Sequence, residues 1–164
     1  MENVLYSAAV YPGTPRQGAA TNTYIFDTTF KYTAIPSISC TSCLNAIYNV
    51  TASTSAVDLN TNVDTAYDFG VILGKSIKDT VCLSSTDTLS CADGLDFIDM
   101  TSPAESMTEV DGVIGLAPSD ELDSGRNFVE QLASTQDYSK QVSFNLMDDE
   151  PYIYFGTPEA DMQV

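Results

Sequence analysis

Short runs of β-branched and aromatic residues, separated by turn residues, recur along most of this chain. Runs of roughly four to eight such residues between Gly, Pro, Asn or Asp are typical of β-strands, whereas helices need longer stretches with apolar residues three and four positions apart. Turn signals include Tyr11-Pro12-Gly13, Asp93-Gly94 and Asp111-Gly112. The pattern predicts strands over residues 4–11, 23–27, 33–36, 64–73, 76–83, 94–100, 112–116, 141–146 and 152–156.

One segment has helical spacing instead. Phe128, Val129 and Leu132 follow the helical period, so we predict a helix over residues 125–133 with Ser124 as its N-cap. Many short strands with one short helix predict a mainly β fold. The 164 residues contain no linker-like or low-complexity segment, and we expect a single domain over residues 1–164.

The charge of the chain limits its partners. Six Lys and Arg residues against 23 Asp and Glu residues give a net charge of −17. Because this charge repels phosphate backbones and anionic lipids, we expect no nucleic-acid and no membrane partner. The hydrophobic content of 43% excludes a disordered chain. Low pH would relieve the repulsion among the carboxylates, so the acidity indicates either an acidic working environment or a role in solubility alone.

The chain contains no histidine. This excludes histidine-based catalytic triads and imidazole metal sites. No second Cys-x-x-Cys motif is present to complete a zinc site, so we expect no metal and no cofactor. Any chemistry therefore depends on carboxylates, hydroxyls or cysteines.

The four cysteines form two local pairs, Cys40 with Cys43 and Cys82 with Cys91. A Cys-x-x-Cys motif can be a redox motif or half of a zinc site, but Cys40 and Cys43 lie in a Ser- and Thr-rich stretch without the strand–turn–helix context of a redox motif. We therefore predict two disulfides and an oxidising compartment. The N-glycosylation sequon at Asn49 favours the same compartment.

The first residues do not resemble a signal peptide, because residues 1–5 include an acid and no basic residue. No stretch approaches the roughly 18 apolar residues of a membrane span. We therefore expect a secreted, lysosomal or vacuolar protein whose signal peptide is not part of this sequence.

A series of segments then becomes specific in order and spacing. They are Gly13-Thr14-Pro15, Tyr24-Ile25-Phe26-Asp27-Thr28-Thr29, Ile35-Pro36-Ser37, Tyr67-Asp68-Phe69-Gly70, Asp111-Gly112-Val113-Ile114-Gly115-Leu116-Ala117-Pro118 and Tyr154-Phe155-Gly156. Together they resemble the N-terminal lobe of the pepsin-like aspartic proteases, the family of pepsin and cathepsin D. The resemblance covers about residues 8–158, and the segment that begins at Asp111 is its most specific part. It implies a pepsin-like acid protease lobe with one or two short helices.

In that family two neighbouring aspartates share one proton and activate a water molecule that attacks the peptide bond. The resemblance therefore implies an aspartic endopeptidase domain that acts on peptides or proteins in extended form. The implied site residues are the catalytic aspartate Asp27, its loop residues Thr28 and Thr29, the flap residues Tyr67, Asp68, Phe69 and Gly70, and Ile114 and Gly115 packing beside the loop.

Several positions depart from the family pattern. Thr29 stands in place of a glycine, and Phe30 in place of a small serine whose hydroxyl supports the acids. Ala34 stands in place of a tryptophan that contacts the flap tyrosine, while Asp68 and Phe69 replace small flap residues. We expect these changes to weaken the support of the catalytic acid.

The family's second Asp-Thr/Ser-Gly motif lies in a C-terminal lobe. Asp123-Ser124-Gly125 is interpreted as a turn or helix cap, because acidic residues precede it instead of an apolar strand. We expect the isolated lobe to be inactive and to be completed by a C-terminal lobe or by a second copy about a two-fold axis. The alternatives are a non-catalytic relative that binds peptides and an extracellular β interaction domain.

Overall fold

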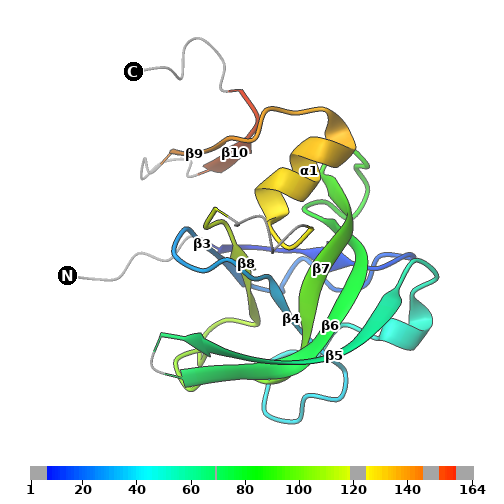
Figure 1. Cartoon of the computed structure of the whole chain (residues 1–164), viewed down its shortest axis with the longest axis vertical. Coiled ribbons are helices and arrows are strands. Elements are labelled where there is room, and N and C mark those ends of the chain that lie inside the picture. Colours follow the sequence, from blue (N-terminus) through cyan, green and yellow to red (C-terminus); the bar gives the residue numbers. More distant parts are fainter. Residues whose placement is uncertain (1–6, 69, 119–124, 146–151, 158–164) are drawn as a thin grey trace.

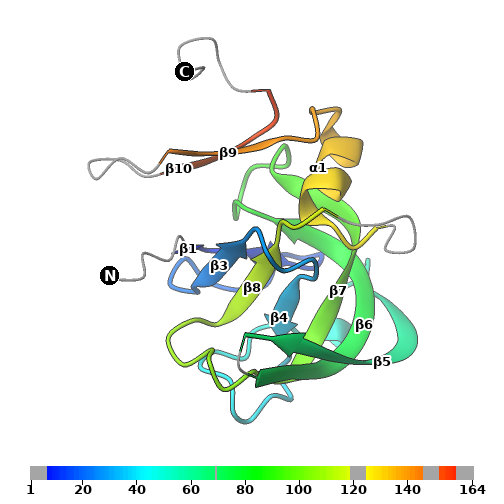
Figure 2. The same ribbon diagram turned by 60° about the vertical axis from the view of Figure 1, so that its left-hand side comes forward.

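The computed structural model describes residues 7–68, 70–118, 125–145 and 152–157. Eight of its strands form one curled sheet in the order β1-β3-β8-β4-β7-β6-β2, with β5 paired to β6 (Figures 1 and 2). β9 and β10 form a separate antiparallel pair. The mainly β prediction is confirmed. The strands are β1 (Ser7–Ala8), β2 (Tyr11–Pro12), β3 (Tyr24–Asp27), β4 (Ala34–Pro36), β5 (Val57–Tyr67), β6 (Gly70–Cys82), β7 (Cys91–Ser102), β8 (Gly112–Gly115), β9 (Val142–Asn145) and β10 (Tyr152–Phe155).

The central strands are buried on both faces. Side chains alternate along a strand, so Tyr24 and Phe26 of β3 enter one hydrophobic cluster while Ile25 enters another. On β8, Ile114 enters the cluster of Tyr24 and Phe26, and Val113 enters the cluster of Ile25. The sheet therefore separates two cores, and the end of β3 lies between them.

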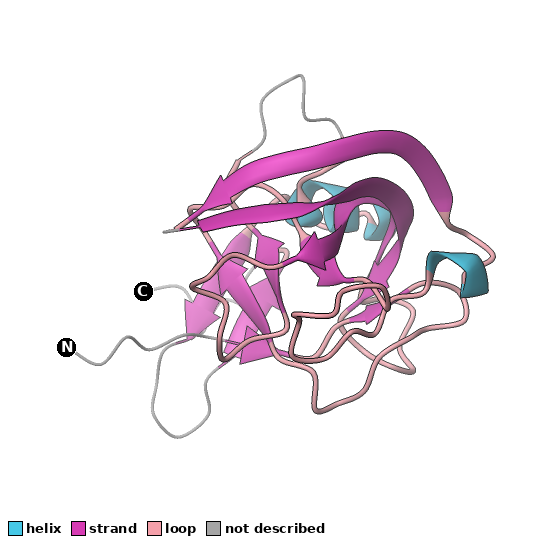
Figure 3. Cartoon of the chain, turned by 90° about the horizontal axis from the view of Figure 1, so that it is seen from below, coloured by secondary structure: helices cyan, strands magenta, loops and turns pink. Residues whose placement is uncertain are grey.

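A long antiparallel hairpin of β5 and β6 curves along one side of the sheet (Figure 3). The prediction of a single strand over residues 64–73 is wrong, because the chain reverses between Tyr67 and Gly70. Apolar residues lie on both sides of this turn, so the sequence pattern did not separate the two strands. Asp68 adopts a left-handed backbone with φ 47°, as a tight turn requires.

The α-helix α1 (Phe128–Gln136) begins later than predicted. Its N-cap is Asn127, whose side chain accepts from the Glu130 N–H at 2.9 Å, and not Ser124. Asp123 and Ser124 lie outside the described residues. The helix begins after Asn127 because the amide of this residue is buried and also donates to the carbonyl of Ala117. A buried amide with both partners satisfied fixes the start of the helix.

Two further differences concern polar segments. The predicted strand over residues 4–11 is two short strands, β1 and β2, which pair with β3 and β6, and residues 4–6 lie outside the described part. The first half of β5 and the 3-10 helix η1 (Val50–Ala52) were not predicted, because both are largely exposed and neither contains a continuous apolar run. Within the described residues, no helix is long and apolar enough to cross a membrane.

Candidate active site

Asp27 is the last residue of β3, where the strand leaves the buried sheet. β3 runs parallel to β8, and Asp27 lies opposite Gly115 in the register. The Leu116 N–H donates to the Asp27 carbonyl at 2.8 Å, and the Ala117 N–H donates to the Phe30 carbonyl at 3.1 Å. The backbone that carries the Asp27 carboxylate is thus held by the segment that follows β8.

Gly115 has to be a glycine for steric reasons. A Cβ at this position would collide with the carbonyl oxygens of Tyr32 and Phe30. Ile114, the residue before it, is fully buried in the core on the other side of the sheet. Gly115 therefore packs against the segment that follows Asp27, whereas Ile114 lies opposite Phe26 of β3 and its side chain fills the core.

Thr29 donates two hydrogen bonds to the same carboxylate oxygen. Its backbone N–H and its hydroxyl each lie 2.7 Å from Asp27 Oδ1. Both Thr28 and Thr29 are exposed, while Asp27 is half-buried. The threonine that departs from the family glycine thus contacts the candidate catalytic acid directly.

Tyr67, the last residue of β5, lies over this acid. Its side chain is only 6% exposed, its phenol lies beside the Asp27 carboxylate, and its ring centroid is 4.8 Å from that of Phe30. Burial raises the pKa of the Tyr67 phenol, and the negative charges of Asp27 and Asp68 raise it further. The phenol therefore remains protonated at neutral and acidic pH.

The rest of the predicted flap is arranged as follows. Asp68 is exposed at the turn, and Phe69 lies outside the described residues. Gly70 packs tightly on the backbone of Ala104 and Glu105, because a Cβ would lie 2.8 Å from the Glu105 nitrogen. The hairpin end is therefore docked against the β7–β8 loop as well as over Asp27.

An aromatic row extends from this site and was not predicted. The rings of Phe30 and Tyr32 lie 5.6 Å apart, and the guanidinium of Arg126 lies 5.6 Å from the Tyr32 ring. Arg126 also forms an ion pair with Asp96 at 3.0 Å. Phe30 and Tyr32 lie two residues apart, as expected for one face of an extended segment, and this spacing was the available signal.

The predicted disulfides Cys40–Cys43 and Cys82–Cys91 are both present, so the sulfurs of the first pair are bonded to each other and do not serve as thiolate ligands of zinc. They indicate an oxidising environment. Cys82 and Cys91 also face each other in the β6–β7 ladder.

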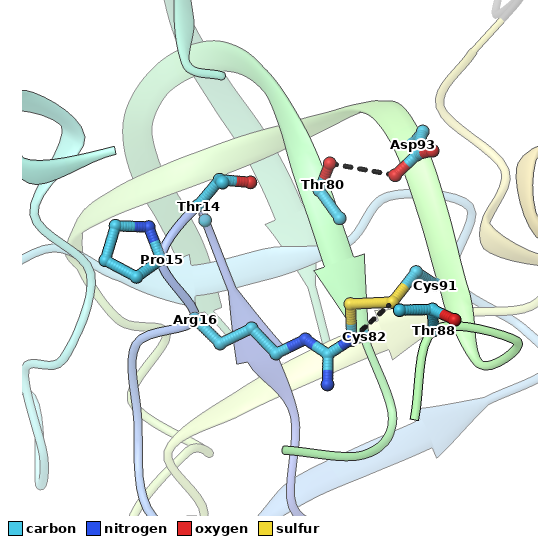
Figure 4. Close-up of a pocket in the computed structure, with 9 residues that line it drawn as sticks. Thr14, Pro15, Arg16, Thr80, Cys82, Thr88, Cys91 and Asp93 are labelled. Carbon is cyan, nitrogen blue, oxygen red and sulfur yellow. Dashed lines mark hydrogen bonds between the residues drawn. A yellow bond between two sulfur atoms is a disulfide. The ribbon is translucent and has the colours of Figure 1, made fainter. Parts of the chain in front are cut away.

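The Cys82–Cys91 disulfide borders a polar cavity of about 320 Å³ (Figure 4). The guanidinium of Arg16 extends along this cavity and donates to the carbonyls of Ser84 at 2.9 Å and Asp87 at 2.8 Å. It thereby ties the loop between β6 and β7 to the N-terminal segment.

Asn49 caps the short helix η1. Its side-chain oxygen accepts from the Thr51 N–H at 3.1 Å and from the Thr51 hydroxyl at 2.8 Å. The side-chain amide of Gln17 donates to the carbonyl of Asn49 and accepts from its N–H. The half-exposed sequon residue therefore lies in a polar turn at the surface.

A buried carboxylate in the sheet was also missed. Asp99 of β7 is 6% exposed, and its Oδ1 is buried without a hydrogen-bond partner among the described residues. Burial raises its pKa to about 6, against opposing effects of a Ser37 hydrogen bond and the Lys75 charge, while Asp58 raises it further. No pattern distinguishes it in sequence from the other strand aspartates.

A curled β lobe with an aspartate at the end of a central strand, under the turn of a long hairpin, is the lobe of a pepsin-like acid protease. The chain belongs to the eukaryotic aspartyl protease family, whose model matches residues 5–158. A search of curated proteins found no match.

Proposed function

We propose that this chain is the half of an aspartic endopeptidase site that supplies Asp27 as one of the two catalytic carboxylates. The observation that carries the proposal is the position of the Asp27 carboxylate at the end of β3, where two hydrogen bonds from Thr29 orient it. Membership of the aspartyl protease family supports the same reaction. Thr28 and Gly115 complete the loop around the acid.

Hydrolysis by this chemistry needs two carboxylates, one to take the proton of the water and one to donate to the scissile carbonyl. We propose that the second carboxylate comes from a C-terminal lobe or from a second copy of the chain. Two copies of charge −17 repel each other, so pairing of copies would be favoured at low pH. The substrate is an extended peptide between the β5–β6 hairpin and Asp27, and Tyr67 has to move away from Asp27 to admit it.

The disulfides and the acidity support a secreted or lysosomal location, with an N-linked glycan on Asn49. Mass spectrometry before and after glycosidase treatment of protein from a eukaryotic host tests the glycan. An unmodified Asn49 would contradict it.

Peptide hydrolysis between pH 3 and 6 tests the proposed reaction, with the chain alone and within the longest natural form of the protein. We expect cleavage that pepstatin inhibits and that Asp27→Asn abolishes. Asp137→Asn is the matched control, because it removes an exposed charge at the C-cap of α1, where Asn also tolerates the left-handed backbone. Cleavage that survives Asp27→Asn would overturn the proposal.

A second function is peptide binding without cleavage, and the buried position of Tyr67 beside Asp27 favours it because the acid is covered. In that case extended peptides bind and remain intact. Asp27→Asn then leaves their affinity unchanged, which isothermal titration would measure.

A further inference from the structure

Two donors from one residue converge on one oxygen of the candidate acid. The Thr29 N–H is fixed by the backbone, whereas its hydroxyl could rotate toward solvent, since the side chain is exposed. It lies instead 2.7 Å from Asp27 Oδ1. Hydrogen bonds to an ionised group are the stronger kind, so this hydroxyl has a defined role at the carboxylate.

The two hydrogen bonds restrict the rotation of the Asp27 side chain. A carboxylate at a strand end can turn about two side-chain torsions. With Oδ1 held by both donors of Thr29, the carboxylate plane is fixed and Oδ2 is left without a donor from this residue. An acid that has to face a water and a substrate carbonyl benefits from this fixed orientation.

The next residue cannot supply the same support. Phe30 is 8% exposed, has no polar side-chain atom, and packs its ring against Tyr67 and Tyr32 at 4.8 and 5.6 Å. Thr29 therefore contacts the acid, while Phe30 contacts the hairpin tyrosine above it.

We propose that Thr29 is the positioning residue of Asp27 and that this frees position 30 to hold Tyr67. Thr29 and Phe30, which were expected to weaken the site, then support it: Thr29 orients the acid, and Phe30 packs against Tyr67. This inference rests on the proposed function, because it assigns Thr29 a role in the Asp27 reaction.

The kinetic test uses the active form of the protein with Thr29→Val and Thr29→Ser. Valine keeps the branched shape and the N–H but removes the hydroxyl, so we expect kcat to fall about 10- to 100-fold with little change in KM. Serine keeps the hydroxyl and restores kcat. Thr86→Val, in the distant loop between β6 and β7, is the matched control. If the parent is active and Thr29→Val has the parent kcat, this inference is wrong while the proposed function stands.

A thermal double-mutant cycle on the isolated chain gives a readout that needs no activity. We expect Thr29→Val to lower Tm by about 3 °C in the parent and by much less in the Asp27→Ala background, because the partner is then absent. Equal shifts in both backgrounds would overturn the positioning role. If no form of the protein cleaves peptides but the shifts are unequal, the proposed reaction fails and the Thr29–Asp27 coupling remains.

Discussion

The phenol of Tyr67, at the end of β5, lies beside the carboxylate of Asp27, at the end of β3, so the Asp27 charge raises the pKa of this phenol. The two residues come from segments that are not paired with each other in the sheet. Whether Tyr67 lies beside Asp27 therefore depends on where the end of the β5–β6 hairpin is placed relative to the acid. The same placement also makes the Tyr67 phenol sensitive to the charge at position 27.

The first prediction concerns this coupling. The phenol of Tyr67 should remain protonated in an alkaline titration beyond the pH at which a free tyrosine ionises, because burial and the Asp27 charge raise its pKa. Asp27→Asn should lower the pKa of Tyr67, since it removes a negative charge that disfavours the phenolate. NMR of the tyrosine rings measures both effects. An unchanged Tyr67 titration in the Asp27→Asn variant would contradict the contact.

The second prediction is a loss of stability with rising pH that depends on Asp99. The folded-state pKa is about 6, above the usual value of 3.8 that the unfolded chain retains. The favourable contribution is thus fully present below pH 4 and is lost as the pH rises through 6, by on the order of 3 kcal/mol for two pKa units.

Asp99→Asn should flatten this part of the stability curve, because the amide does not ionise. Urea unfolding at pH 4, 5, 6 and 7 measures the change, with Asp137→Asn as the control for an exposed carboxylate. A slope between pH 4 and 6 that is the same in Asp99→Asn and in the parent would disprove the assignment.

The third prediction separates steric crowding from backbone strain. Gly115→Ala should destabilise the chain by about 3 kcal/mol and shift the backbone signals of residues 27–32, because its Cβ meets the carbonyls of Tyr32 and Phe30. Gly125→Ala meets open space and should cost only about 1–2 kcal/mol through its positive φ of 87°. Chemical denaturation and NMR of both variants check this, and equal perturbation of residues 27–32 would refute it.

The fourth prediction ranks the disulfides. Loop-closure entropy gives about 3 kcal/mol for Cys82–Cys91, whose residues are 9 apart, and about 2 kcal/mol for Cys40–Cys43, whose residues are 3 apart. Replacing each pair by alanine should therefore destabilise the chain more at Cys82–Cys91. Guanidinium unfolding of the two double variants measures the order, and the reverse order would contradict it.

The sequence predicted the sheet well where strands are apolar and poorly where they are polar. β3, β4 and β8 lie within one residue of their predicted bounds, because both of their faces are buried and the apolar runs are continuous. The outer half of β5 exposes most of its side chains to solvent, and its two apolar residues, Val57 and Leu59, do not form a continuous run. Its pairing with β6 comes from the hairpin, which no local pattern reveals.

Motif order predicted which residues form the candidate site, but it did not predict their contacts. Asp27, Tyr67 and Gly115 were identified by their place in the chain, and the fold brings them together. From the sequence, Thr29 and Phe30 were interpreted only as departures from the family's glycine and serine, and no contact was predicted for the Thr29 hydroxyl or the Phe30 ring. Their partners come from a carboxylate two residues back and a hairpin more than 30 residues away, and such partners require coordinates.

The side chain of Asn127 has one further consequence. Its oxygen caps α1, and its nitrogen donates to the carbonyl of Ala117, whose own N–H reaches Phe30. Serine and aspartate would cap the helix as well, but aspartate has no donor when ionised and the serine side chain is too short to serve both partners. The general preference for N-cap residues therefore suggests more replacements for Asn127 than this position accepts. Only an amide of this length joins the start of α1 to the loop beside the acid.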